Sequence, residues 1–153
     1  MTTADALRSA RPAVTADLMQ RTGLDEAMLG RLVHGFYDRV RTDPLLAPVF
    51  AERVSDWGPH LDRMVDFWSS VALLTGRYHG APMPKHLPLP VEAEHFDRWL
   101  ELFRQTALET CPPTGAAWVI ERAERIAGSI QMNILDARVK YGSDGNRAGF
   151  AGG

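Results

Sequence analysis

Apolar side chains recur at three- and four-residue steps along most of this chain, and the strict alternation of a β-strand is almost absent. A period of three to four residues is that of an amphipathic helix with one buried face. The period extends over residues 25–41, 55–74, 91–109 and 115–140, and a short turn of helix is expected over 45–50. Long helices joined by short breaks predict an all-α domain.

The 153 residues fit a single domain with a less ordered segment at each end. Residues 1–14 are small and polar and offer little to bury, so we expect them to be disordered or loosely ordered. Residues 142–153 are rich in glycine and are expected to form a flexible tail. The folded domain is therefore predicted over residues 15–141.

Composition and charge argue against several classes of function. The formal net charge is −2, and no cluster of Lys and Arg offers a surface for nucleic acid. No stretch approaches the ~20 apolar residues of a membrane span, and the N-terminus lacks an apolar run of the signal-peptide type. Cys111 is the single cysteine, so no internal disulfide can form. We therefore expect a cytoplasmic protein that binds neither nucleic acid nor membranes.

One histidine lies in a segment that cannot form a long helix. Residues 83–90 read Met-Pro-Lys-His-Leu-Pro-Leu-Pro, and Pro84 and Pro88 leave His86 on at most one helical turn. The segment belongs to a long connection between two helices, where binding residues concentrate. His86 is therefore either a ligand held in place by its neighbours or an exposed loop histidine.

The apolar faces of the predicted helices carry several polar-tipped rings. These are Tyr37, Trp57, Trp68 and Trp99, and His60 is the one polar residue of the two apolar stripes on the second helix. Taken singly, each has an ordinary structural interpretation. His60 fits a core histidine bonded to a backbone carbonyl, Tyr37 a half-buried phenol that reaches water, and Trp99 a core residue.

Taken in order, these residues resemble a known family. The series is Phe36-Tyr37, Pro48-Val49-Phe50, Trp57-x-x-His60, Phe67-Trp68, Lys85-His86-Leu87 and Trp99-Leu100-x-Leu102-Phe103. Its order and spacing resemble the truncated haemoglobins, the group III subfamily in particular, over about residues 29–135. The glycine pairs that mark groups I and II are not evident in this chain.

The resemblance implies a two-over-two helical sandwich around one b-type haem. His86 matches the proximal iron ligand of the family, and His95, which opens the third helix, is its one rival. Tyr37, His60 and Trp99 match the polar positions on the distal side of the haem. The resemblance therefore implies that the haem has one histidine below it and three polar side chains above it.

Haem is a flat apolar ring with two carboxylates, so it needs a slot between aromatic and aliphatic side chains. Phe50 matches the family phenylalanine that packs on the porphyrin, and Met64 the apolar position one turn after His60. The slot is predicted from three groups of side chains: Met64, Phe67 and Val71 on one wall, Phe36 and Phe50 on another, and Phe96, Leu100 and Phe103 behind.

The resemblance further implies reversible binding of the diatomic ligands O2, NO and CO. Tyr37 offers an O–H and Trp99 an indole N–H, which can only donate, so the pocket has more donors than simple storage requires. We therefore expect redox chemistry as well, either of NO with O2 or of peroxide, with an unidentified reductase as a partner. The protein is expected to be a monomer or a weak dimer.

Two other classes of function stay open at this point. One is a non-haem metal enzyme that uses His79, His86 and His95, although no Asp or Glu stands three or four residues from His86. The other is a helical interaction module whose tryptophan-rich faces bind a partner. The absorption spectrum of the purified protein distinguishes the three classes, because only the globin has a haem band.

Overall fold

Six helices and no strand make up the part of the chain that the computed structural model describes, residues 9–80 and 91–151. The helices are α2 (Pro12–Thr22), α3 (Glu26–Thr42), α4 (Ala47–Arg53), α5 (Trp57–Leu73), α7 (Ala93–Thr110) and α8 (Pro113–Ala151). The all-α class predicted from the sequence is confirmed. None of these helices is both long and apolar enough to cross a membrane.

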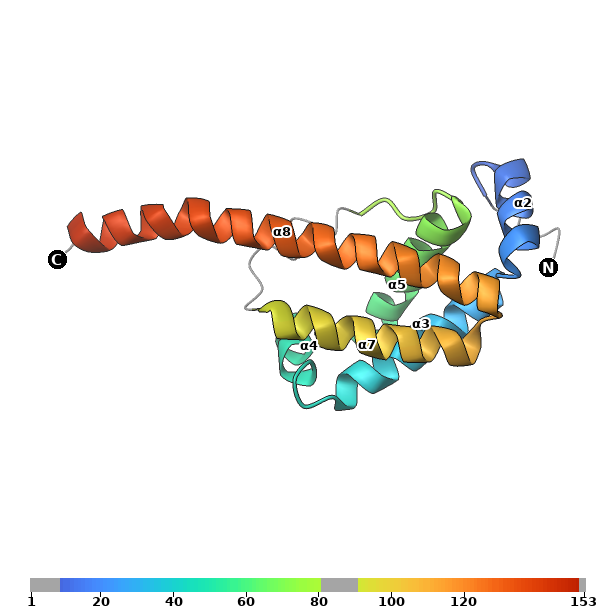
Figure 1. The fold of residues 1–153 in the computed structure, drawn as a ribbon, viewed down its shortest axis with the longest axis horizontal. Coiled ribbons are helices and arrows are strands. Elements are labelled where there is room, and N and C mark those ends of the chain that lie inside the picture. Colours follow the sequence, from blue (N-terminus) through green and yellow to red (C-terminus); the bar gives the residue numbers. More distant parts are fainter. Residues whose placement is uncertain (1–8, 81–90, 152–153) are drawn as a thin grey trace.

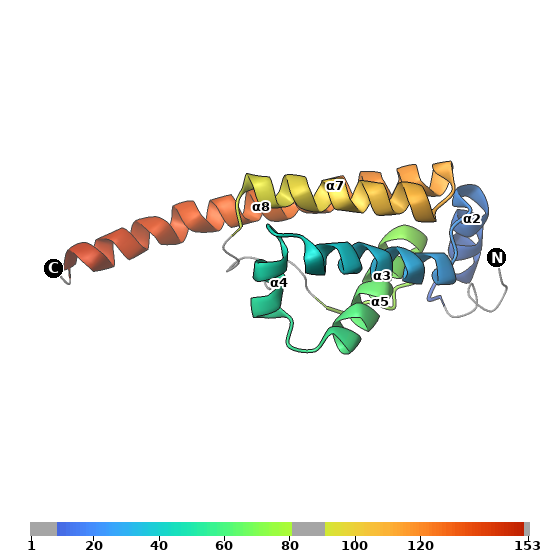
Figure 2. The same cartoon turned by 90° about the horizontal axis from the view of Figure 1, so that it is seen from below.

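The helices are arranged in two layers. α7 packs along α8 in one layer, α3 packs on α5 in the other, and α3 also packs on α7 across the two. Figure 2 shows α7 and α8 above α3 and α5, with α4 below the start of α7. This arrangement is the two-over-two sandwich that the resemblance to the truncated haemoglobins implies.

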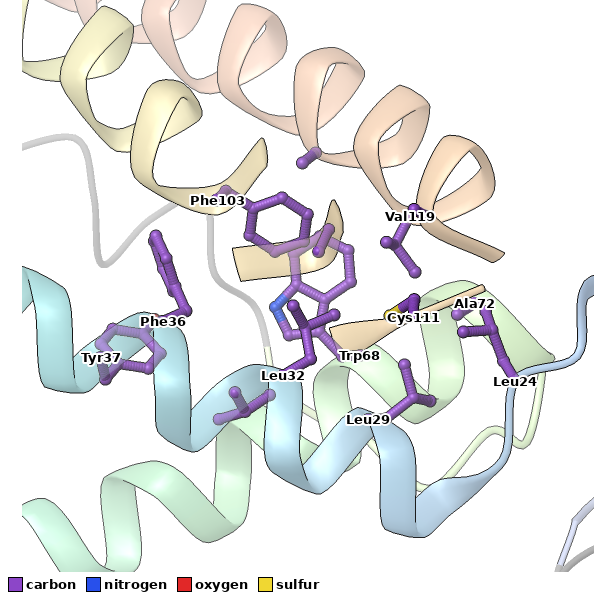
Figure 3. Packing of buried hydrophobic residues seen from close by; sticks show 14 of the residues in the cluster. Leu24, Leu29, Leu32, Phe36, Tyr37, Trp68, Ala72, Phe103, Cys111 and Val119 are labelled. Atoms are coloured by element: carbon purple, nitrogen blue, oxygen red, sulfur yellow. The ribbon is translucent and has the colours of Figure 1, made fainter. Parts of the chain in front are cut away.

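A glycine lets α3 and α7 approach closely. A Cβ atom at Gly35 would lie 3.3 Å from Cγ2 of Thr106, which is a tight contact. Beside this position, Phe36 and Phe103 are each 1% exposed, and their rings lie edge to face with centroids 5.4 Å apart. Trp68 from α5 stacks on Phe103 at 4.8 Å, as Figure 3 shows. Buried aromatic rings therefore join the two layers.

α2 is a helix that the apolar pattern does not predict. Its four buried residues mix polar and apolar types: Thr15, Leu18, Met19 and Thr22. A hydrophobic period counts the threonines as polar, yet Oγ1 of Thr15 donates to the backbone oxygen of Leu73 at 2.8 Å and is satisfied against the end of α5. The helical part of the chain therefore begins earlier than the period indicates.

α8 is long and reaches beyond the two layers. It continues to Ala151, past the end near Lys140 that the sequence predicts. Figures 1 and 2 show its second half projecting away from the other helices. Before it leaves them, Ile130 and Ile134 pack against Val91 at the start of α7 and form a second, smaller core. The limits of the domain stay predictions.

Candidate functional site

A cavity of about 500 Å³ opens between α4, α5, α7 and α8. Its size lies within the range of small-molecule and cofactor sites. Most of its wall is apolar, and α8 contributes Ile126, Ala127, Ile130 and Ile134. The other helices contribute mainly larger side chains, among them Val49, Phe50, Met64, Phe67, Trp68, Phe96 and Trp99. Phe50, Met64, Phe67 and Phe96 are therefore at the cavity wall where the sequence predicts cofactor contacts.

α5 forms one side of the cavity, and the residue at which the helix begins sets which of its side chains face the cavity. The carboxylate of Asp56 accepts a hydrogen bond from the N–H of Gly58 at 3.3 Å and caps the helix start. His60, Met64 and Phe67 then follow at steps of four and three residues, which place them on the same side of the helix. All three line the cavity.

Tyr37 on α3 brings together rings from α4 and α5. Its ring centroid lies 5.3 Å from that of His60, 5.9 Å from that of Phe50 and 5.8 Å from that of Trp57. Tyr37 is 5% exposed, and burial raises the pKa of its phenol well above the usual range. The phenol therefore stays protonated at neutral pH and keeps an O–H that can donate.

Trp99 lines the cavity from α7, in the other layer. Its indole stacks on Phe103 with centroids 5.5 Å apart and 14° between the planes, and it meets Phe36 edge-on at 5.2 Å. Phe36 and Phe103 are not among the lining residues, although the sequence proposes them as cofactor contacts. Both are buried in the core, as Figure 3 shows, and their rings pack against the indole of Trp99.

The histidine predicted to ligate iron, His86, lies outside the described residues, and its role stays a prediction. Its rival His95 lines the cavity at the start of α7, where its Nδ1 accepts the backbone N–H of Glu92 at 2.9 Å. A neutral imidazole that accepts at Nδ1 carries its proton on Nε2, which then has no lone pair for a metal. His95 would have to give up this bond at the helix start to bind iron.

The alternative of a non-haem metal enzyme finds no support in the described part of the chain. It contains no group of three or more His, Cys, Asp or Glu side chains that could hold a metal ion. His79, which the non-haem alternative requires together with His86 and His95, is exposed.

Sequence reasoning missed three polar residues of the cavity wall: Arg53, Arg63 and Tyr78. Arg53 follows Phe50 by three residues, and Arg63 follows His60 by three, so helical spacing from the predicted site residues could have found both. Tyr78 packs edge-on against Phe67 with centroids 5.2 Å apart. No Asp or Glu of the described chain lines the cavity, so its charged groups are basic.

Comparison with known proteins relates the whole fold to one family. A family model described as bacterial-like globin matches residues 17–131. The group 3 truncated hemoglobin of Campylobacter jejuni is 32% identical over 124 residues, which are 78% of this chain and 94% of that protein. The group 2 truncated hemoglobin YjbI of Bacillus subtilis is 31% identical over 83 residues, which are 53% of this chain and 63% of that protein.

Solved structures give the same relationship. The crystal structure of the group III truncated hemoglobin from Campylobacter jejuni superposes with a TM-score of 0.68 at 31% identity, covering 72% of this chain and 91% of that one. The hemoglobin of Chloroflexus aurantiacus superposes with a TM-score of 0.61 at 24% identity, covering 74% of this chain and 95% of that one. At that identity the second likeness concerns the fold alone.

Proposed function

Because the chain belongs to the bacterial-like globins, and to the group III truncated haemoglobins among them, we propose that its cavity holds one haem b that binds O2 and other diatomic ligands. The observation that carries the proposal is the cavity of about 500 Å³, whose apolar wall includes Tyr37, His60 and Trp99. An apolar slot with a few converging polar groups is typical of cofactor sites.

The side chains present fit the two halves of a haem. The flat ring needs apolar surface on both faces, and Met64 and Phe67 of α5 line the same cavity as the isoleucines of α8. The two carboxylates need cations or donors, and Arg53 and Arg63 line the same cavity. The wall therefore has both the apolar and the cationic surface that this amphipathic group requires.

His86 is the side chain that would hold the iron. Its setting between Pro84 and Pro88, together with its match to the family position, supports this role over His95. The bond between the N–H of Glu92 and Nδ1 of His95 supports the same choice, because it leaves the proton of His95 on Nε2. When bound, the haem would supply an iron atom with an open coordination position for a diatomic ligand.

On the distal side, Tyr37 and Trp99 would supply the hydrogen bonds to the ligand. Both are donors at neutral pH, Tyr37 because burial raises the pKa of its phenol and Trp99 because an indole N–H can only donate. His60 packs edge-on against Tyr37 and would either contact the ligand or control its access. Phe50 and Trp57 pack on Tyr37 from α4 and α5 and keep water from its ring.

The number of donors favours chemistry on the ligand over simple storage. A store must release O2 readily, whereas two donors that converge on a ligand hold it and stabilise the negative charge that develops on it. The proposed substrates are O2 together with NO, or peroxide, and turnover would require an unidentified reductase.

Titration of haem-free protein with haem tests the proposal. We expect one equivalent to give a Soret band, and the reduced form to take up CO with the band shift of a histidine-ligated haem. Ile130→Trp places a large ring inside the cavity and should abolish uptake, since Ile130 lines it and is 8% exposed. Leu108→Trp is the matched control, because Leu108 is 67% exposed on α7. Equal haem uptake by both variants would contradict the assignment of the cavity.

A further inference from the structure

Asp43 ends one helix and begins the turn into the next. Its backbone N–H donates to the oxygen of Val40 at 3.2 Å, at the end of α3. Its Oδ2 accepts from the N–H groups of Leu45 and Leu46 at 3.1 and 3.0 Å, and its backbone oxygen accepts from the N–H of Ala47 at 2.9 Å. A single residue therefore fixes the direction in which α4 leaves α3.

The other oxygen of the same carboxylate bonds to α7. Oδ1 of Asp43 accepts from Nε of Arg98 at 2.7 Å, and the Asp43 side chain is only 3% exposed. A charge-assisted bond to a buried carboxylate is short and directional. Arg98 also pairs with Glu101, one turn further along α7, at 3.1 Å. The guanidinium of Arg98 is therefore held by two carboxylates. Through its own bonds Asp43 connects α3, α4 and α7.

Each of these three helices carries at least one aromatic ring of the cavity. Tyr37 lies on α3, Phe50 on α4, and Trp99 on α7 directly after Arg98. Phe36 separates the rings of Trp99 and Tyr37, with centroid distances of 5.2 and 5.0 Å to them. Apolar packing of this kind is non-directional and tolerates small shifts. The directional bonds of Asp43 are what can fix the relative position of the three helices.

We propose that Asp43, acting through Arg98, is a positioning residue that sets the spacing of Tyr37, Phe50 and Trp99 around the ligand. The proposal rests on the haem function proposed above. Neither Asp43 nor Arg98 lines the cavity, so their effect on the ligand passes through the helices. Misplacement of a donor by a fraction of a hydrogen-bond length weakens the bond steeply.

The variant Arg98→Met tests the proposal. Methionine keeps the apolar stem and the helix propensity of the side chain and removes the bond to Asp43. Arg104→Met is the matched control, because Arg104 lies on the same helix and pairs with Glu124 of α8 at 3.0 Å, away from the cavity. Two properties of the haem-bound protein are measured: the C–O stretching band of the CO complex, which reports donors near the ligand, and the O2 dissociation rate.

Arg98→Met should shift or broaden the C–O band and speed O2 dissociation several-fold, whereas Arg104→Met should change neither. Arg98→Met added to the double variant Tyr37→Phe with Trp99→Phe should release O2 no faster than that double variant alone, because the positioning effect needs the donors that are positioned. Arg98→Lys keeps the charge and should give an intermediate band. This second variant decides the matter if Arg98→Met does not fold.

Three results would overturn the proposal. They are an unchanged C–O band in Arg98→Met and Arg98→Lys, an equal change in Arg104→Met, or an effect of Arg98→Met that persists in full when both Tyr37 and Trp99 are replaced by Phe. A wild-type chain that takes up no haem would overturn the proposed function, and this inference with it. Haem uptake with an unchanged band would overturn this inference alone.

Discussion

The rings of Tyr37 and His60 meet edge to face at an interplanar angle of 82°, with centroids 5.3 Å apart. The two residues come from different helices and lie 23 positions apart in the sequence. Their contact makes a polar corner in a cavity whose wall is mostly apolar. It also explains why sequence reasoning that takes each ring singly finds only ordinary core residues.

Removal of the phenol oxygen tests the donor role of Tyr37. A hydrogen bond to a charged acceptor contributes about 1.5–3 kcal/mol. Tyr37→Phe should therefore speed O2 dissociation by roughly ten- to a hundredfold, at about 1.4 kcal/mol per tenfold. Stopped-flow displacement of O2 measures the rate. Tyr78→Phe, at another position on the cavity wall, is the control, and an equal effect of both would remove the special role of Tyr37.

Alkaline titration tests the protonation of the same phenol. Burial raises the pKa of Tyr37, so its contribution as a neutral donor is complete below the ordinary tyrosine value of about 10 and persists above it. Wild type and Tyr37→Phe should give the same phenolate absorbance up to about pH 11. An extra phenolate in the wild type near the ordinary value would show that Tyr37 is not shielded from solvent.

Acid should weaken the protein through Asp43. Burial disfavours its charged form, but hydrogen bonds from Arg98 and from the N–H groups of Leu46 and Leu45 outweigh this and lower its pKa. The contribution to stability is thus complete above the unfolded value of about 3.9 and is lost as pH falls through the lower folded pKa. Asp43→Asn should cost about 1–3 kcal/mol near neutral pH and less in acid.

Urea unfolding at about pH 7 and about pH 3 measures this difference between Asp43→Asn and wild type. Asp17→Asn is the control, because Asp17 is exposed and its carboxylate forms a surface ion pair with Arg21, so its effect should be below ~1 kcal/mol. A penalty for Asp43→Asn that stays constant over this range would mean that its carboxylate does not titrate as the contacts require.

Much of the fold could be predicted from the sequence because α3, α5 and α7 each bury one continuous stripe. Phe36, Leu32 and Val40, for example, recur at helical steps and are all buried. The period fails for α2, where Thr15 is fully buried through its bond to Leu73 and no apolar pattern marks it. Pattern reasoning finds helices that bury apolar side chains and misses one that buries satisfied hydroxyls.

The candidate site could be predicted where it lies on helices whose apolar residues recur at a clear helical period. Tyr37, His60 and Trp99 were singled out in the sequence, and all three line one cavity. Whether a buried ring faces the cavity or the core depends on how the two layers meet, which a single helix does not reveal. For that reason Phe36, which the sequence places at the wall, lies behind it, and Phe103, predicted as a cofactor contact at the back of the slot, is not among the lining residues. Arg53 and Arg63 line the cavity and are not predicted from the sequence.

Catalysis is tested by mixing the oxy form with NO and, separately, the ferric form with peroxide and a reducing dye. If Tyr37 and Trp99 stabilise charge on the ligand, nitrate should form faster than in Tyr37→Phe, and peroxide should be consumed faster than by free haem. The expected loss in Tyr37→Phe is roughly ten- to a thousandfold. Rates equal to those of the variant and of free haem would leave ligand binding or sensing as the function.

The identity of the iron ligand is the most direct test of the account, and the ferrous spectrum of the haem-bound protein measures it. His86→Ala should lose the histidine-ligated spectrum and retain haem poorly, and added imidazole should partly restore it. His95→Ala should keep the wild-type ferrous spectrum, because Nδ1 of His95 is engaged with the N–H of Glu92. A wild-type spectrum in His86→Ala, with its loss in His95→Ala, would contradict the account and assign the iron to His95.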